Sequence, residues 1–209
     1  RPPSDIYSLP IHASLQFCRH EPVQHISDAL DRIQEKTGLN IHIHVDAASG
    51  GMIAPFIQPD LAWDFRVKRV VSISTSGHKY GLVYPGLGWV VWRSTADLPE
   101  SLVFKVSYLG GEMPTFALNF SRPGAQVLLQ YYMFLRLGVE GYRRVQQASH
   151  DVTKYLSSEI AAMDDFTLWN DGSDIPVFAW MLKDKPGRKW NLYDLQDRLR
   201  MKGWLVPAY

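Results

Sequence analysis

The chain has 209 residues, of which 46% are hydrophobic, 21% charged and 12% aromatic, and its formal net charge is +1. Such a composition is typical of a globular protein long enough for one large core, or for one domain and part of another. The small net charge argues against a nucleic-acid surface that depends on bulk charge, and no apolar stretch is long enough to cross a bilayer.

Cysteine content and the N-terminal sequence bear on compartment and processing. Cys18 is the single cysteine, so an internal disulfide is excluded and a reducing compartment fits. The chain begins with Arg1 rather than Met, and RPPSDIYSLPIHASL lacks the charged-then-apolar pattern of a secretory signal. We therefore expect a cytoplasmic protein, and a chain that is either a fragment or a product with an altered start.

The first predicted element is an amphipathic helix over residues 22–38. Its apolar side chains recur at helical spacing and share one face: Ile26, Ala29, Leu30 and Ile33. Gly38 stands at the position of a C-cap, which predicts that the helix ends there.

Three strands are predicted next. In the segment IHIHVD, apolar residues alternate with polar ones, so His42, His44 and Asp46 share one face. The runs at 69–75 and 88–94 are rich in β-branched and aromatic residues, which favours strands buried on both faces of a sheet. A helix followed by buried strands, without tight hairpin turns, indicates an α/β layer.

The second half of the chain changes in character after a long helical region. Residues 123–163 are predicted to be helical, with a break or bend marked by Gly138 and Gly141. Beyond them, FTLWND and IPVFAWML predict strands, NLYDLQDRLRMKG predicts a helix, and WLVPAY predicts the start of another strand. We therefore expect a domain boundary inside the helical region and a smaller α+β domain after it.

His42, His44 and Asp46 form the first candidate for chemistry. Neutral imidazoles and a carboxylate on one strand face are compatible with a divalent metal, as in metal-dependent hydrolases. The alternative is that these residues line the polar side of a half-buried strand. Because the sequence has no further His or Cys cluster at ligand spacing, we expect no metal site.

A second candidate joins Asp46 to Lys79, which lies in the segment STSGHKYG. Each residue follows a predicted strand and is flanked by small residues, and ligands of open α/β sheets gather outside the carboxyl ends of the strands. A desolvated lysine can form a Schiff base, and an aspartate can hold a protonated ring nitrogen. Proteins hold pyridoxal phosphate with this pair of groups. A structural ion pair between Asp46 and Lys79 is an alternative that the spacing leaves open.

Three segments resemble a known family. HVDAASGG (44–51), WDFRVKRVVSISTSGHKYGLVYPGLGWVVWR (63–93) and YLGGEMPTFALNFSRPGAQ (108–126) closely resemble glutamate decarboxylases. These enzymes are group II pyridoxal-phosphate decarboxylases of the fold-type-I, aspartate aminotransferase-like superfamily. The resemblance runs from about Pro22 to Tyr209, and SGHKYGLVYPGLGWVVWR is its most specific motif.

The resemblance implies how the chain divides into domains. Residues 1–135 would be part of the large α/β domain that binds pyridoxal phosphate, with a mainly parallel sheet, and residues 1–21 diverge from the family. Residues 136–209 would be the long connecting helix and an incomplete small α+β domain.

The resemblance also implies catalytic roles for three residues. Lys79 matches the lysine that forms the Schiff base with the cofactor, and Asp46 matches the aspartate on the pyridine nitrogen. His78 matches the histidine beside the cofactor and its phosphate. His44 belongs to the same motif, and we assign it a supporting role only.

Three further residues match cofactor-binding positions. Ala48 matches the small residue against the ring face, and Ser76 matches a residue near the phosphate and the lysine. Ser121 matches a serine that, in bacterial relatives, reaches the cofactor phosphate of the neighbouring subunit, which implies a homo-oligomer. Each has a structural alternative: Ala48 is small because two backbones approach, Ser76 relieves crowding in a turn, and Ser121 caps the helix near Pro123.

The implied activity is pyridoxal-phosphate-dependent decarboxylation of L-glutamate to 4-aminobutyrate and carbon dioxide, with no nucleic-acid or membrane partner. Family members carry a long region before the position of Pro22, which grips the phosphate and the substrate, and their C-terminal domain continues beyond WLVPAY. We therefore expect a truncated fragment. Its alternatives are a catalytically incompetent remnant and a decarboxylase of another amino acid.

Overall fold

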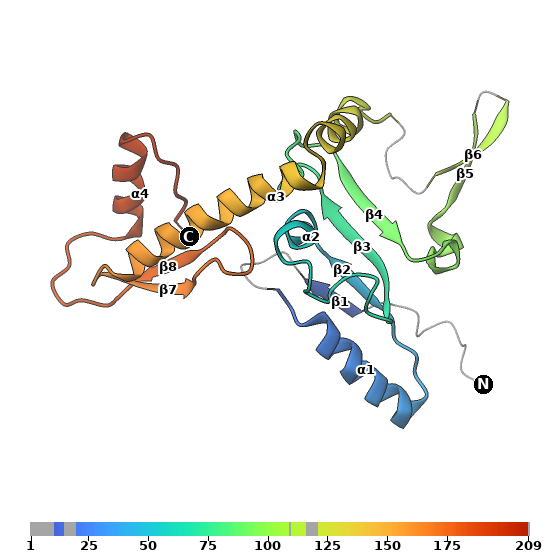
Figure 1. The fold of residues 1–209 in the computed structure, drawn as a ribbon, viewed down its shortest axis with the longest axis horizontal. Helices are drawn as coiled ribbons and strands as arrows, with labels where there is room; N and C mark the ends of the chain where they lie inside the picture. Colours follow the sequence, from blue (N-terminus) through green and yellow to red (C-terminus); the bar gives the residue numbers. More distant parts are fainter. Residues whose placement is uncertain (1–10, 15–19, 109, 116–120, 209) are drawn as a thin grey trace.

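The structure is a computed structural model that describes residues 11–14, 20–108, 110–115 and 121–208 (Figure 1). Cys18 lies outside this described part, as do residues 116–120 of the segment 108–126 that resembles the family. The helices and strands are, in chain order, β1 (Ile11–Ser14), α1 (Val23–Thr37), β2 (Ile43–Asp46), α2 (Ala54–Ile57), β3 (Val70–Ser76), β4 (Gly88–Trp92), β5 (Phe104–Tyr108), β6 (Gly111–Thr115), α3 (Ala125–Ala161), β7 (Phe166–Asn170), β8 (Ala179–Leu182) and α4 (Leu192–Met201). Short 3-10 helices lie at Gly50–Met52, Thr95–Asp97 and Glu100–Leu102.

The main sheet has the strand order β1-β2-β3-β4, with β1, β2 and β3 parallel and β4 antiparallel to β3. A mainly parallel sheet in an α/β layer is therefore confirmed. Burial of the 88–94 strand on both faces is wrong, since Val90 and Val91 are 37% and 47% exposed. The reason is position: β4 ends the strand order, so it has a strand neighbour on one side only within the described chain.

Helix α1 covers the core of this sheet, and it ends at Gly38, which is left-handed with φ 75°. The predicted helix is thus confirmed, but its predicted face is partly wrong because Ile33 is exposed. The buried side is instead Val23, Ser27 and Leu30. The core cluster joins this helix to the strands and the loops beside them: Val23, Leu30, Ile43, Val45, Ala47, Ala54, Trp63, Val67, Val70 and Ile73.

A buried arginine holds α1 against the start of β3. Arg69 is 6% exposed and its guanidinium donates to four acceptors, which belong to Asp31, Gln34, Asn40 and the carbonyl of Ile41. A buried charge is tolerated when its donors are satisfied in this way. The arginine therefore joins α1 and the loop after it to the start of β3.

We expect Arg69→Met to lower the free energy of unfolding by about 2 kcal/mol, because it removes the donor that Asp31, Gln34, Asn40 and the Ile41 carbonyl share. The control is Arg32→Met, the same change at an exposed arginine of α1, with an expected loss below about 0.5 kcal/mol. Urea denaturation of both variants measures the difference. Equal losses in the two variants would contradict the role given to Arg69.

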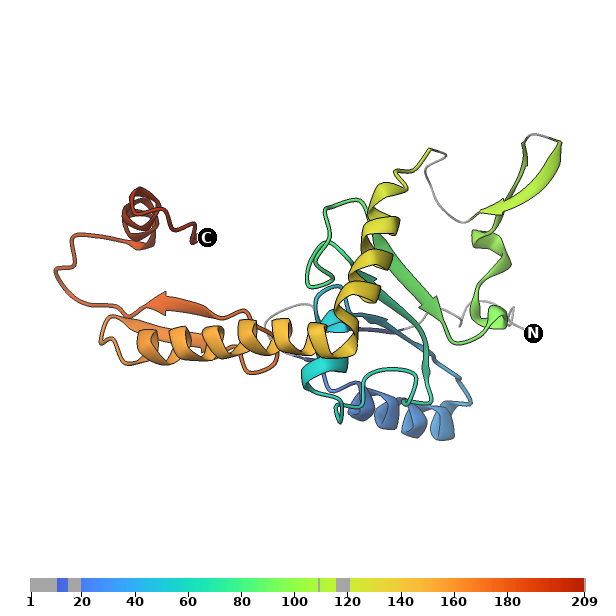
Figure 2. The same cartoon turned by 45° about the horizontal axis from the view of Figure 1, so that its top comes forward.

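Helix α3 is bent at Gly138, which has φ 60° and ψ −172° inside an otherwise continuous helix. Figure 2 shows its two halves running in clearly different directions. The predicted break is confirmed at Gly138, whereas Gly141 remains helical. Glycine permits the bend because a positive φ costs it little.

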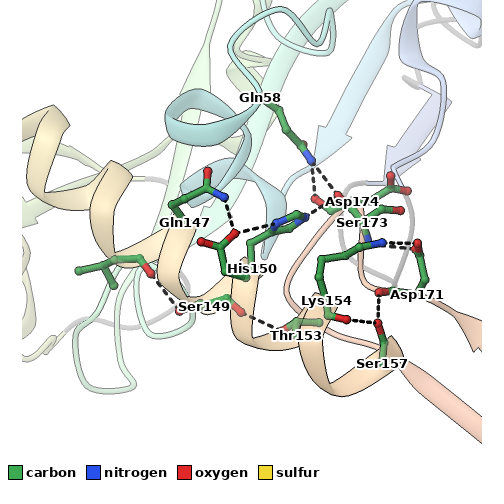
Figure 3. A network of polar contacts seen from close by, with 12 residues as sticks. Gln58, Gln147, Ser149, His150, Thr153, Lys154, Ser157, Asp171, Ser173 and Asp174 are labelled. Carbon is green, nitrogen blue, oxygen red and sulfur yellow. Dashed lines mark hydrogen bonds and ion pairs between the residues drawn. The ribbon is translucent and has the colours of Figure 1, made fainter. Parts of the chain in front are cut away.

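The second half of α3 is tied to the turn that follows β7 (Figure 3). Lys154 forms an ion pair with the Asp171 carboxylate, and Ser157 Oγ donates to the Asp171 carbonyl at 2.9 Å. The hydrogen bond from Lys154 is the largest cause that lowers the pKa of Asp171 from its ordinary value. This pairing anchors one side of the turn to the helix.

The other side of the same turn is anchored to α3 and to the residue after α2. His150 Nε2 lies 3.0 Å from the Ser173 carbonyl, and Gln58 Nε2 donates to the Asp174 carbonyl at 2.9 Å (Figure 3). The segment that leads into β8 is therefore held against both helices, which fixes α3 relative to the main sheet.

Two antiparallel pairs, β5–β6 and β7–β8, lie outside the main sheet. The β5–β6 hairpin has no counterpart among the predicted elements, and β8 is shorter than the predicted strand. The strand predicted for WLVPAY is absent from residues 204–208. The backbone there pairs with α4 instead, because Trp204 N donates to the Leu199 carbonyl and Ala208 N donates to Gln196 Oε1. Among the described helices, none is long and apolar enough to span a membrane.

Candidate active site at the carboxyl ends of β2 and β3

Strands β2 and β3 end side by side, and the loops that follow them are hydrogen-bonded to each other. The parallel register places Asp46 opposite Ser74. Ala47 N donates to the Ser74 carbonyl at 2.8 Å, and Ser76 N donates to the Ala48 carbonyl at 3.2 Å. The segments that carry Asp46 and Lys79 therefore meet at one edge of the sheet, where ligands of α/β proteins bind.

The Lys79 amine is directed toward the loop after β2. Its Nζ donates to Ser49 Oγ at 3.5 Å, and Ser49 is 6% exposed. Lys79 itself is half-buried, and its backbone N–H donates to the Ser76 carbonyl at 3.4 Å. The lysine thus follows the end of β3 in a tight turn, and its long side chain returns to the neighbouring loop.

The Asp46 carboxylate is held through one of its two oxygens. Oδ1 accepts hydrogen bonds from Ala48 N at 3.1 Å and from Ser74 Oγ at 3.5 Å. Within the described residues, no hydrogen bond reaches Oδ2 of this carboxylate. One oxygen is therefore oriented by the protein, and the other is left to accept from a ligand.

A second line of polar contacts supports Asp46 from β2 and β3. His44 Nδ1 lies 2.7 Å from Ser72 Oγ, and His44 Nε2 lies 3.3 Å from Ser74 Oγ. Ser74 therefore stands between His44 and Asp46, a position that the sequence analysis missed. Its signal is the serine alternation in VVSISTS, whose pairing with the HIHVD strand becomes visible only once the register is known.

The remaining predicted residues are spread around this edge. Ser76 ends β3, Ala48 follows Asp46, and exposed His78 has Nδ1 3.4 Å from the Leu87 carbonyl. Ser121 is exposed, and in the described chain no hydrogen bond joins it to Lys79. Its alternative role as a helix cap is wrong.

The helix beside Ser121 begins two residues later than the predicted start at 123. Its first residue is Ala125 and its N-cap is Gly124, with no side-chain cap. The hydroxyl of Ser121 therefore has no part in capping α3, and its predicted contact with a cofactor phosphate stays a prediction.

Close packing of the two loops leaves one hydroxyl unsatisfied. A Cβ on Gly51 would lie 2.7 Å from Thr75 Oγ1, so only glycine allows this approach. Thr75 Oγ1 is buried without a hydrogen-bond partner among the described residues. An unpaired buried hydroxyl is costly, and such atoms gather at sites where a ligand completes the bonding.

Metal ligation finds no support at this edge. In the part of the chain that the structure describes, no group of three His, Cys, Asp or Glu residues is placed to hold a metal ion. His42 Nε2 lies 3.1 Å from Asn40 Nδ2, which pairs it with a neighbouring loop residue.

Comparison with known proteins decides the family. The pyridoxal-dependent decarboxylase conserved domain matches residues 7–183. The chain belongs to the pyridoxal-dependent decarboxylase family. The match begins ahead of Pro22, where the resemblance in the sequence analysis begins, and it includes Asp46 and Lys79.

Relatives within this decarboxylase family are similar over most of the chain. Glutamate decarboxylase of Aliivibrio fischeri is 56% identical over 193 residues, which are 92% of this chain and 42% of the relative. Glutamate decarboxylase beta of Listeria innocua is 53% identical over 191 residues, or 91% of this chain and 41% of the relative. The chain thus spans less than half the length of these relatives.

A solved structure confirms the fold. Lactobacillus brevis glutamate decarboxylase superposes with a TM-score of 0.89 at 48% identity, covering 96% of this chain and 46% of that one. The α/β fold of pyridoxal-phosphate-dependent enzymes of the aspartate aminotransferase-like type, present here as a partial domain, is therefore confirmed.

Pyridoxal 5′-phosphate, the cofactor that membership in this family implies, suits the groups present at the sheet edge. An amine from Lys79 matches the cofactor aldehyde, and the open Oδ2 of Asp46 matches its ring nitrogen. Hydroxyls of Ser49, Ser76 and Thr75 are donors of the kind that phosphate accepts. The residues present therefore fit the cofactor.

Proposed function

We propose that the protein that carries this chain decarboxylates L-glutamate to 4-aminobutyrate and carbon dioxide, and that Lys79 carries the cofactor. The observation that supports this most is the joining of the Asp46 and Lys79 loops by backbone hydrogen bonds of 2.8 and 3.2 Å at the end of a parallel sheet. The names of relatives at 53% and 56% identity support glutamate as the substrate.

Lys79 and Asp46 divide the work in this proposal. When bound, pyridoxal phosphate supplies an aldehyde carbon for amines and a ring that takes up the electron pair left by departing carbon dioxide. Lys79 would hold the cofactor through Nζ. Asp46 would hold the ring nitrogen through Oδ2 and so would keep that nitrogen protonated. Ser74 and His44 hold the carboxylate in the required orientation.

The other predicted residues complete the proposed cofactor site. Ala48 would lie against the ring face, Ser76 and His78 would lie near the phosphate, and Ser121 would reach the phosphate of a neighbouring subunit. The last assignment makes the protein a homo-oligomer. A single cysteine is consistent with work in the reducing cytoplasm.

Substrate choice is tested by supplying the full-length protein with pyridoxal phosphate and carboxyl-labelled L-glutamate, and measuring labelled carbon dioxide together with 4-aminobutyrate. L-Aspartate and aromatic L-amino acids serve as competing substrates. Release from another amino acid, with none from glutamate, would contradict the substrate and leave the decarboxylase chemistry in place. A site that accepts cofactor at Lys79 but decarboxylates no amino acid would contradict both.

A further inference from the structure

Helix α3 donates side-chain hydrogen bonds to the backbone of the loop that contains Lys79. The loop runs from Gly77 to Leu87, between β3 and β4. The donors and their carbonyl acceptors are Gln126 to Pro85 at 3.2 Å, Gln130 to Gly81 at 2.9 Å, Tyr142 to Gly81 at 2.9 Å and Gln146 to Tyr80 at 2.8 Å. The carbonyls of Tyr80 and Gly81, immediately after Lys79, receive three of these bonds.

Three of these four donors are buried although they are polar. Gln130 is fully buried, and Tyr142 and Gln146 are each 1% exposed. Burial raises the pKa of Tyr142, so its hydroxyl stays protonated and donates. Burying an amide or hydroxyl costs free energy unless it is paired. Each donor atom is paired with a loop carbonyl, whereas Gln130 Oε1 is buried without a hydrogen-bond partner among the described residues. We therefore infer that these side chains are buried because they bond to the loop backbone, and not because the helix itself needs them.

The loop is built to receive Gln130. A Cβ on Gly77 would lie 2.5 Å from Gln130 Oε1, and a Cβ on Gly81 would lie 2.7 Å from the same atom. Both positions flank Lys79 at a spacing of two residues. The small residues around Lys79 in SGHKYG thus allow the glutamine to reach the loop backbone.

Donors from both halves of the bent helix converge on this loop. Gln130 precedes the bend at Gly138, and Tyr142 and Gln146 follow it. Gln130 Nε2 and the Tyr142 hydroxyl lie 3.0 Å apart, so the two halves meet across the bend. Both helical segments thereby hold the Gly81 carbonyl, and the second segment also holds the Tyr80 carbonyl, which leaves the loop little freedom to shift.

We propose that Gln130, Tyr142 and Gln146 are positioning residues that hold the backbone after Lys79 and so set where its amine stands. The proposal rests on the cofactor-bearing role of Lys79 given above. It goes beyond that role because none of these side chains needs to touch the cofactor or the substrate. A shift of the loop by a fraction of an ångström would move the amine from its place at the sheet edge.

The first test measures the loop without any cofactor. Hydrogen–deuterium exchange of the cofactor-free, full-length protein compares Gln146→Leu with Gln147→Leu, the same change at the neighbouring exposed residue. Tyr142→Phe, which keeps the ring and removes the donor, is the second variant if Gln146→Leu does not fold. We expect faster exchange in the Gly77–Leu87 peptide for Gln146→Leu and Tyr142→Phe, and wild-type exchange for Gln147→Leu.

The second test follows cofactor attachment. Pyridoxal phosphate is added, trapped with borohydride at timed intervals, and mapped by mass spectrometry. We expect attachment at Lys79 to slow about tenfold in Gln146→Leu, with a weaker visible circular dichroism of the bound cofactor, and to be unchanged in Gln147→Leu.

The results of these two tests distinguish failure of the positioning role from failure of the proposed function. Unchanged exchange in the loop, or faster exchange with unchanged attachment at Lys79, overturns the positioning role alone. A wild-type protein that takes the cofactor at other lysines overturns the role of Lys79, and with it any effect of the helix on cofactor attachment. Faster loop exchange together with slower attachment at Lys79 supports both.

Discussion

Lys79→Ala is expected to abolish decarboxylation, with a loss of about a thousandfold or more, because it removes the amine that holds the cofactor in the proposed function. In the described chain, the Lys79 amine makes a single long hydrogen bond, to Ser49 at 3.5 Å. Removing it therefore costs the fold little, and the melting temperature should stay close to the wild-type value. Activity and stability are thus expected to separate at this position.

Two measurements test this prediction: the rate of decarboxylation, and mapping of the peptide that carries the reduced cofactor. Borohydride reduction in the presence of pyridoxal phosphate should label the wild-type peptide at Lys79 and leave that peptide unlabelled in Lys79→Ala. Lys68→Ala, at an exposed lysine just before β3, is the matched control and should keep both label and activity. Retained turnover in Lys79→Ala would show that another group carries the cofactor.

Asp46→Asn is expected to weaken binding of pyridoxal phosphate by about 10- to 100-fold, and to lower turnover further. The amide keeps the shape of the carboxylate and can still accept from Ala48 N, which lies 3.1 Å from Oδ1. It loses the negative charge that stabilises a protonated ring nitrogen, and a charge-assisted hydrogen bond contributes about 1.5–3 kcal/mol. The cofactor would then bind less tightly and accept electrons less readily.

A titration of the cofactor by fluorescence, followed by assay at saturating cofactor, divides these two effects. Asp60→Asn, at an exposed aspartate, is the control for loss of one negative charge. Asp46→Ala should be worse than Asp46→Asn, because it also removes the acceptor for Ala48 N and Ser74 Oγ. Wild-type affinity and turnover in Asp46→Asn would be incompatible with a carboxylate on the ring nitrogen.

Local patterns predicted the elements whose signals are contained in short segments. Alternation in IHIHVD predicted β2, and the glycines within residues 123–163 predicted the bend that the structure has at Gly138. Pairing between strands was harder to predict from the sequence. The β5–β6 hairpin was missed, and β4 was predicted to be buried although its place at the end of the sheet exposes it.

The polar residues of the site also differ in whether the sequence alone could identify them. Asp46 and Lys79 follow predicted strands, so the sequence alone was enough to predict that both belong to one ligand site. Ser74 became visible only through the register of β2 with β3. Gln130 and Gln146 were missed because helical periodicity places a glutamine on the solvent side, and only the packing of α3 on the loop reveals them as buried donors.

The bend at Gly138 has a consequence for helical phase. Gln126 and Gln130 are four residues apart, as are Tyr142 and Gln146, so each pair occupies one face of its own helical half. In a straight helix, with about 100° of rotation per residue, the two faces would point about 160° apart. The bend brings both pairs onto one loop. An insertion or deletion between Gln130 and Tyr142 would rotate one pair off its carbonyls, so the number of residues between them is constrained as strictly as the residues themselves.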